Sequence, residues 1–191
     1  MEFDKLRDLM MEARSIRRFR EGETVADATL EKLVELTRYC ASGRNAQPLR
    51  YRLVTSQEMR EKVFPLLKWA GYYTNWPGPE PGERPAAYMI QCLDTKYGTD
   101  CLCDDGLQLE AIVLGMRTLG LGGCIIKAFN APALAKILDL PERYAPRYVL
   151  ALGYPAEVVR LEEMAGEDFK YYRTPDGVHH VPKRRLGELL I

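Results

Sequence analysis

The segment Arg14-Ser15-Ile16-Arg17-Arg18-Phe19 brings several guanidinium groups and a hydroxyl group together directly after an amphipathic stretch. Guanidinium groups match the planar geometry of carboxylates and phosphates and donate several hydrogen bonds at once. The segment is therefore a candidate binding site for a phosphorylated ligand. A structural alternative stays open, because arginine near the C-terminus of a helix also interacts favourably with the last carbonyl groups and the helix dipole.

A second polar segment, residues 42–48, contains Ser42, Asn45 and Gln47 and leads directly into an alternating strand. These side chains donate and accept hydrogen bonds, so they are suited to contact a ligand. Turn chemistry alone also explains the glycine, asparagine and proline of this segment as a connection between a helix and a strand. Both interpretations remain open from the residues alone.

Charge and cysteine content argue against several other kinds of site. Lysine plus arginine and aspartate plus glutamate both number 27, so the formal net charge is zero and no overall basic field favours nucleic acid. The odd number of cysteines, mostly inside apolar runs, predicts reduced thiols rather than a disulfide framework. Cys101 and Cys103 lack the usual two-residue spacing and a second pair, so no metal site is expected. The adjacent His179 and His180 have no serine nucleophile nearby, which argues against a hydrolytic triad.

Length and hydropathy predict one cytoplasmic domain over residues 1–191. No window approaches the length of an apolar membrane span, and the N-terminus lacks the pattern of a signal peptide. We therefore expect no membrane partner and no nucleic-acid partner.

Hydrophobic periodicity predicts an alternation of helices and strands that positions the two polar segments. Helical spacing is seen over 3–13, 27–41 and 104–119, and shorter helices are expected after Ser56 and Asn130, with Asp27 as a candidate N-cap. Strands are expected over 49–54, 86–93, 124–128 and 148–152. The almost continuously apolar run 86–93 predicts a central strand covered on both faces. Residues 104–119 are apolar around nearly the whole helix, which predicts burial in the core and at a subunit interface.

Three stretches fall outside this periodic pattern. Residues 69–85 are rich in proline, glycine and aromatic residues and hold both tryptophans, so we expect a flap that covers a ligand. Residues 156–191 form a polar C-terminal extension with a basic cluster at 183–185. The glycine cluster 120–123 lacks the G-x-G-x-x-G and G-K-[ST] patterns and follows a helix, so neither a Rossmann nor a P-loop site is expected.

Taken together in this order, four motifs resemble the FMN-dependent nitroreductase family over nearly the whole chain. They are Arg14-Ser15-Ile16-Arg17, Ser42-x-x-Asn45-x-Gln47-Pro48, the helix running into Gly120-Leu121-Gly122-Gly123-Cys124-Ile125, and the strand ending Leu152-Gly153-Tyr154-Pro155. The resemblance implies an α/β (α+β) fold with a mixed central sheet flanked by helices. It also implies an intertwined homodimer with FMN at sites shared by both subunits.

The resemblance also assigns roles to residues by matching position. It implies that Arg14, Ser15 and Arg17 hold the FMN phosphate, ribityl chain and flavin edge, and that Lys183 and Arg185 join them at the phosphate. Ser42, Asn45 and Gln47 would reach the flavin from the other subunit, and the backbone of Lys127 and Ala128 would lie near flavin N5. The chain departs from the family at Ala41 and Leu49, where proline and an aromatic residue are frequent.

The function implied is an oxidoreductase that takes a hydride from NADH or NADPH and reduces an electron-poor acceptor, nitroaromatic-like or quinone-like, by ping-pong transfer through flavin N5. No side chain is expected to act as a nucleophile, because the cofactor carries the chemistry. Arg17 is the candidate for stabilising negative charge on the reduced flavin. Two alternatives remain: another reaction on the same fold, such as alkene reduction, dehalogenation or flavin breakdown, and a non-catalytic FMN-binding or sensing module.

Overall fold

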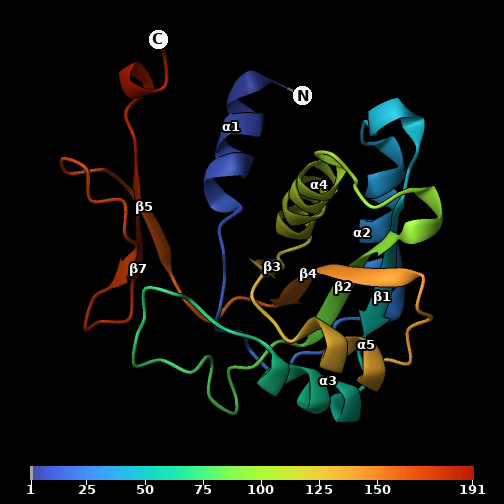
Figure 1. Cartoon of the computed structure of the whole chain (residues 1–191). Coiled ribbons are helices and arrows are strands. Elements are labelled where there is room, and N and C mark those ends of the chain that lie inside the picture. The colour runs from blue at the N-terminus through green and yellow to red at the C-terminus, as the bar shows by residue number, and fades with distance from the viewer. Residues whose placement is uncertain (1) are drawn as a thin grey trace.

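The computed structural model describes residues 2–191, which form a central sheet, a smaller second sheet and surrounding helices (Figure 1). The helices are α1 (Phe3–Glu12), α2 (Asp27–Leu36), α3 (Gln57–Val63), α4 (Asp104–Thr118) and α5 (Ala131–Ile137). The strands are β1 (Leu49–Val54), β2 (Ala87–Asp94), β3 (Gly122–Ile126), β4 (Tyr144–Gly153), β5 (Val159–Glu163), β6 (Tyr172–Arg173) and β7 (His179–Lys183). Short 3-10 turns occur at Thr37–Tyr39, Gly43–Asn45, Phe64–Leu66, Thr95–Tyr97 and Leu186–Glu188.

The central sheet has the strand order β1-β2-β4-β3, and its neighbouring strands are antiparallel. Strand β2 is buried along its whole length, which confirms the predicted central strand. Successive side chains of β2 enter opposite cores because strand residues alternate between faces. Tyr88 and Ile90 pack with residues of α3 and α5, whereas Met89 packs with residues of α2 and α4.

These two cores make the molecule a sheet covered by helices on both faces, so the predicted α+β fold class is confirmed. Parallel strand pairing is rare among residues 2–191. It occurs at the bridge between Ser15 and Gly123, at the edge of the central sheet, and between β5 and β7 in the smaller sheet.

Helix α4 lies between α1 and α2 in the helical layer (Figure 1). One of its faces is buried through Leu109, Ile112 and Met116. Leu107, on another side of the helix, is 44% exposed, so burial in the core is confirmed for one face and burial at a subunit interface stays a prediction. Helix α1 keeps Phe3 (76% exposed) and Met10 in solvent, and none of its residues is fully buried in the single chain.

Two boundaries near the polar segment 42–48 also differ from the prediction. The α-helical geometry of α2 ends at Leu36 and tightens into a 3-10 turn, instead of continuing to residue 41. Asp27 is the first helical residue and Ala26 is the N-cap, so Asp27 complements the helix dipole rather than capping the first turn.

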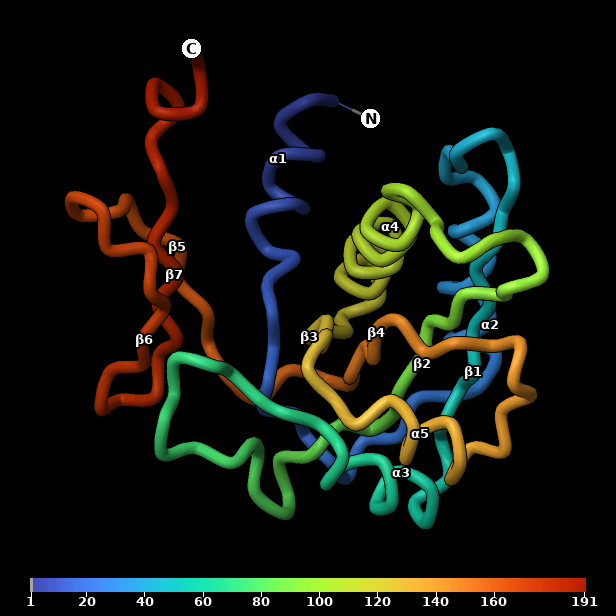
Figure 2. The backbone as a smooth tube through the Cα atoms, viewed as in Figure 1, coloured from blue at the N-terminus to red at the C-terminus, as the bar shows by residue number. Residues whose placement is uncertain are grey.

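The C-terminal extension contains the three-stranded sheet β5-β7-β6, which the sequence pattern did not reveal. The aromatic flap, residues 69–85, runs alongside this sheet (Figure 2). The rings of Tyr72 and Tyr171 lie 4.9 Å apart, and those of Tyr73 and Tyr171 lie 5.3 Å apart. The flap therefore packs against the extension through aromatic contacts.

Candidate functional site

The segment Arg14–Arg18 lies beside the edge strand β3. The Ile16 amide donates to the Gly123 carbonyl at 2.9 Å, next to the Ser15–Gly123 bridge. Glycine is required at position 122 for this close approach, because a Cβ there would lie 2.6 Å from the Ile16 side chain. At Gly123 a Cβ would instead lie 2.7 Å from the Ala151 carbonyl oxygen of β4. The glycine cluster thus lets the arginine-rich segment join the sheet edge.

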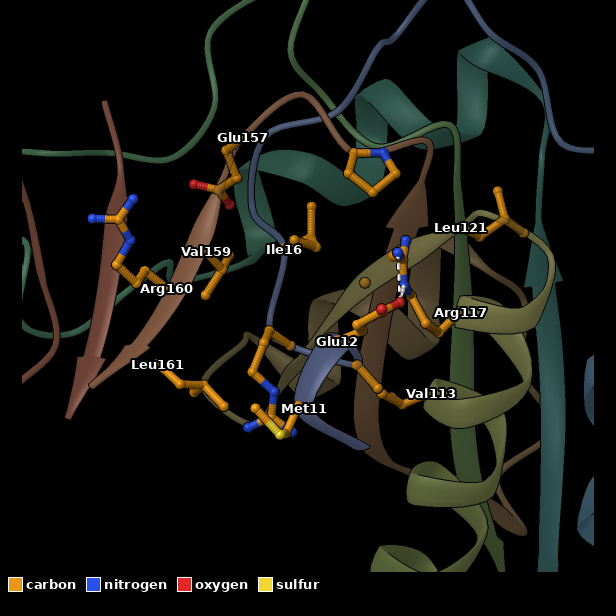
Figure 3. Close-up of a pocket in the computed structure, with 15 residues that line it drawn as sticks. Met11, Glu12, Ile16, Val113, Arg117, Leu121, Glu157, Val159, Arg160 and Leu161 are labelled. Atoms are coloured by element: carbon orange, nitrogen blue, oxygen red, sulfur yellow. Dashed lines mark hydrogen bonds and ion pairs between the residues drawn. The ribbon is translucent and has the colours of Figure 1, made fainter. Parts of the chain in front are cut away.

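The Arg14 side chain donates a hydrogen bond to the end of helix α1 and also lines a cavity. Its Nη2 donates to the Met10 carbonyl at 2.7 Å, so the structural role considered from the sequence is present. Its Nε is buried and has no hydrogen-bond partner in the described chain. The cavity, of about 440 Å³, lies between α1, α4, β3 and β5, and an ion pair between Glu12 and Arg117 (2.7 Å) closes one side (Figure 3).

Arg17 is almost fully buried, with 8% of its surface exposed. Its Nη1 lies 3.1 Å from Nε2 of His179, and its guanidinium lies over the Tyr171 ring at 4.9 Å. The Nε of Arg17 is buried without a partner among residues 2–191. Arg17 is thus held from one side while part of its donor capacity remains free.

Glu157 anchors the arginine segment to the C-terminal extension. Its side chain is 1% exposed and accepts hydrogen bonds from the backbone amides of Arg17 (2.5 Å) and Arg18 (3.2 Å). It also forms an ion pair with Arg173 at 2.5 Å. Sequence reasoning did not identify Glu157, because these partners are separated from it by up to 140 positions or belong to the unpatterned extension.

His179 occupies a buried position between Arg17 and the flap residue Tyr73, whose hydroxyl contacts Nδ1. Arginine can only donate, so Nε2 accepts and the proton resides on Nδ1, which donates to the Tyr73 oxygen. Burial, together with the positive charges of Arg17 and Arg173, lowers the pKa of His179 from 6.5 to about 4. The imidazole is therefore neutral at neutral pH.

This pKa shift predicts a loss of stability in acid. The folded-state pKa of His179 lies below its unfolded value, so its contribution to the free energy of unfolding is complete above pH 6.5 and falls away towards pH 4. The loss should reach up to about 3 kcal/mol. Urea unfolding between pH 7 and 4 should show a steeper decline for the wild type than for His179→Gln. Parallel declines in the two proteins would contradict the assignment.

The second polar segment is fixed to the start of α4 by Asp104, which is 1% exposed. Its carboxylate accepts from the Ser42 hydroxyl at 2.6 Å and from the Gly43 amide at 2.9 Å. Positive φ angles occur at Arg44 (55°), Asn45 (56°) and Gln47 (47°). Such conformations are strained for residues other than glycine and cluster at functional sites.

Replacing Asp104 with alanine should release this loop. Two donors would lose their buried acceptor, and we expect a loss of about 2–4 kcal/mol in the free energy of unfolding. Denaturant unfolding of Asp104→Ala and Asp104→Asn measures it. The asparagine variant should lose less, because its amide oxygen still accepts one hydrogen bond. Equal stability of all three proteins would show that Asp104 does not hold the loop.

The other residues assigned by resemblance lie elsewhere. Lys127 and Ala128 follow β3 at the surface, with Lys127 Nζ donating to the Arg147 carbonyl at 3.1 Å. Lys183 ends β7, and Arg185 pairs with Glu163 at 3.1 Å. Within the described chain, neither Lys183 nor Arg185 lines the cavity beside Arg14.

The structure thus brings Arg14, Ser15 and Arg17 together beside β3 but leaves the loop with Ser42, Asn45 and Gln47 beyond α4 (Figure 1). Residues 2–191 contain no group of three or more His, Cys, Asp or Glu side chains that could hold a metal ion. Across the same residues, every helix is too short or too polar to cross a bilayer.

The fold and the arginine segment beside β3 define an α+β protein of a recognisable class. The sequence profile of the Nitroreductase family matches residues 10–81 and 103–154, and the chain belongs to this family. This match includes the arginine segment, the loop 42–48 and the glycine cluster.

Known proteins agree with this membership. The oxygen-insensitive NADPH nitroreductase of Salmonella typhimurium is 27% identical over 167 residues, covering 78% of this chain and 65% of that protein. The chain thus spans about two thirds of the length of this relative. A nitroreductase family protein from Clostridium difficile has a TM-score of 0.64 at 21% identity, covering 100% of this chain and 98% of the other. A candidate nitroreductase from Exiguobacterium sibiricum, solved in complex with FMN, has a TM-score of 0.68 at 17% identity and coverages of 82% and 90%.

Proposed function

We propose that this protein is an FMN-dependent oxidoreductase that uses NADH or NADPH to reduce an electron-poor acceptor of nitroaromatic-like or quinone-like structure. Family membership supports the proposal, as do the name of the Salmonella relative and the FMN complex of the Exiguobacterium protein. The observation that carries it is that the Nε atoms of Arg14 and Arg17, on one short segment, are buried without a hydrogen-bond partner among residues 2–191. The Nε of the neighbouring Arg18 also lacks a hydrogen bond there, but it lies 3.3 Å from the Glu83 carboxylate.

Those donors fit the chemistry of FMN. The Nε atoms of Arg14 and Arg17 are buried without acceptors in the described chain, and leaving such donors unmet costs free energy. FMN offers phosphate, hydroxyl and carbonyl oxygens, which are suitable acceptors for arginine. Bound FMN would supply hydride acceptance and hydride donation at a single site.

The chain's own residues would bind and orient this cofactor. Arg14 and Ser15, with Lys183 and Arg185, would hold the phosphate and ribityl chain. Arg17 would face the flavin edge, where its fixed positive charge stabilises negative charge that develops on reduction. The backbone of Lys127 and Ala128 would lie at the reacting edge. The nicotinamide would leave before the acceptor enters, which gives ping-pong kinetics.

A homodimer would complete the site. The loop bearing Ser42, Asn45 and Gln47 lies across α4 from the arginine segment in the same chain, so the matching loop of a second copy would supply these groups. The exposed apolar residues Phe3 and Met10 of α1 and Leu107 of α4 offer a surface for this association. Burial of such residues is the usual driving force for forming a dimer.

FMN titrations of Arg14→Ala and Arg185→Ala test the phosphate assignment. Each variant should bind FMN about tenfold more weakly at low salt, because a charge-assisted hydrogen bond is lost. The difference from wild type should shrink in high salt, which screens exposed charges. Arg38→Ala is the control, since Arg38 is an exposed arginine near the end of α2 that pairs with Glu35 at 3.7 Å. Unchanged affinity in both test variants would show that the phosphate lies elsewhere.

A further inference from the structure

Three segments far apart in the sequence meet around Arg17. The flap provides Tyr73, and the C-terminal extension provides Tyr171 and His179. The His179 ring lies 5.8 Å from the Tyr73 ring and 5.3 Å from the Tyr171 ring. Arg173 lies over the Tyr73 ring at 5.1 Å, which adds a cation–π contact. The flap and the extension are therefore joined at the arginine of the proposed flavin site.

The two hydrogen bonds of His179 have fixed donors and acceptors. Arg17 Nη1 donates to His179 Nε2 at 3.1 Å, and the Nδ1 proton of the same ring is donated to the Tyr73 oxygen. Because Arg17 can only donate, it selects the tautomer in which Nε2 accepts and Nδ1 carries the proton. The Tyr73 oxygen then accepts this buried Nδ1 proton, which would otherwise lack a partner.

The partner of Arg17 is neutral, and this matters for ligand binding. The buried carboxylate of the cluster, Glu157, is paired with Arg173 and with backbone amides, so among residues 2–191 the Arg17 guanidinium has no ion-pair partner. Burial and the nearby arginines keep His179 uncharged by lowering its pKa. A neutral acceptor fixes the direction of the guanidinium without cancelling its charge. Among residues 2–191, that charge is therefore not neutralised by a carboxylate.

We propose that His179 is a positioning residue that orients Arg17 towards FMN, and that the flap residue Tyr73 holds the imidazole ring in place by accepting its Nδ1 proton. The inference rests on the proposed function, since it concerns the same flavin site. In this proposal, the flap and the C-terminal sheet together fix the orientation of the buried Arg17 guanidinium.

Three variants separate this role from simple packing. His179→Phe keeps a buried ring but removes the acceptor, and it should weaken FMN binding about tenfold. His179→Gln can still accept from Arg17 through its amide oxygen and should stay close to wild type. Tyr73→Phe removes one hydroxyl and should weaken binding about threefold, because the Nδ1 proton loses the acceptor that holds the ring in place. His180→Phe is the matched control, since His180 instead contacts Glu162 at 3.0 Å.

The midpoint potential of bound FMN and a double-mutant cycle provide readouts that packing alone would not change. His179→Phe should lower the potential, because the oriented positive charge no longer stabilises reduced FMN. Adding His179→Phe to Arg17→Ala should cause no further loss of affinity, since both changes remove one interaction. Additive losses in the cycle would overturn the inference.

The outcomes distinguish this inference from the proposed function. A wild-type protein that does not bind FMN would overturn both. FMN binding by the wild type with unchanged affinity and potential in His179→Phe would overturn the positioning role alone. If His179→Phe does not fold, Tyr73→Phe decides, and wild-type affinity and potential in that variant would overturn the role.

Discussion

Replacing Arg17 with alanine should weaken FMN binding by about a hundredfold, the largest effect expected from one side chain at this site. The change removes a buried fixed charge and several donors at once, and charge-assisted hydrogen bonds contribute about 1.5–3 kcal/mol each. Arg17→Lys keeps the charge but loses the planar fork, so it should fall between alanine and wild type. Fluorescence titration with FMN measures all three affinities.

Arg20→Ala provides the control for Arg17. Arg20 lies three positions further along the same segment, but its side chain is exposed and pairs with Glu23 at 2.7 Å. Its loss should leave FMN affinity unchanged. If Arg17→Ala bound FMN as tightly as the wild type and the Arg20→Ala control, the arginine segment would not be the flavin site.

Leu107→Glu should convert the proposed dimer into a monomer that no longer retains FMN. Leu107 is 44% exposed on α4, so a glutamate is tolerated there in an isolated chain. Inside an interface the same carboxylate would be buried without a partner, at a cost of several kcal/mol. Light scattering and the flavin content after gel filtration measure the two expected losses. Lys32→Glu, at an exposed position of α2, should leave both unchanged.

A folded Leu107→Glu protein that stays dimeric would show that α4 does not form the interface. A wild-type protein that is monomeric and still retains FMN would contradict the shared site itself. These results separate an error in the position of the interface from an error in the composition of the site.

Much of the central layer could be predicted because its signals are local. The apolar run of β2 reflects burial on both faces, and the periodicity of α2 and the apolar surface of α4 reflect contact with the sheet. The glycines at the start of β3 were visible as a pattern, but their contacts were not. Only the fold shows that Gly122 packs against Ile16 and that the Gly123 carbonyl accepts a hydrogen bond from the Ile16 amide.

The anchors of the candidate site escaped prediction because their partners are distant in sequence. Asp104 holds Ser42 from 62 positions away, and Glu157 holds Arg17 from 140 positions away. No periodicity records such pairs. Asp104 still left one usable signal, since an aspartate at the start of an otherwise apolar helix is a reasonable candidate for a hydrogen-bonding role.

The C-terminal sheet was missed for a different reason. Strand β5 has the sequence Val-Arg-Leu-Glu-Glu and β7 has His-His-Val-Pro-Lys, so neither shows a run of apolar residues. Most of their residues are half-buried or exposed, and half-buried strands leave a weak hydrophobic pattern. An apolar helix face in a sequence indicates burial but does not indicate whether the same chain or a second copy covers it, so burial of the exposed face of α4 at a subunit interface stays a prediction.

The absorption spectrum of the purified protein tests the central claim most directly. The account predicts a yellow protein with a flavin spectrum that releases FMN on denaturation, in an amount equal to the chain concentration. A colourless protein that also fails to bind added FMN would contradict the assignment of Arg14, Ser15 and Arg17 to a flavin site.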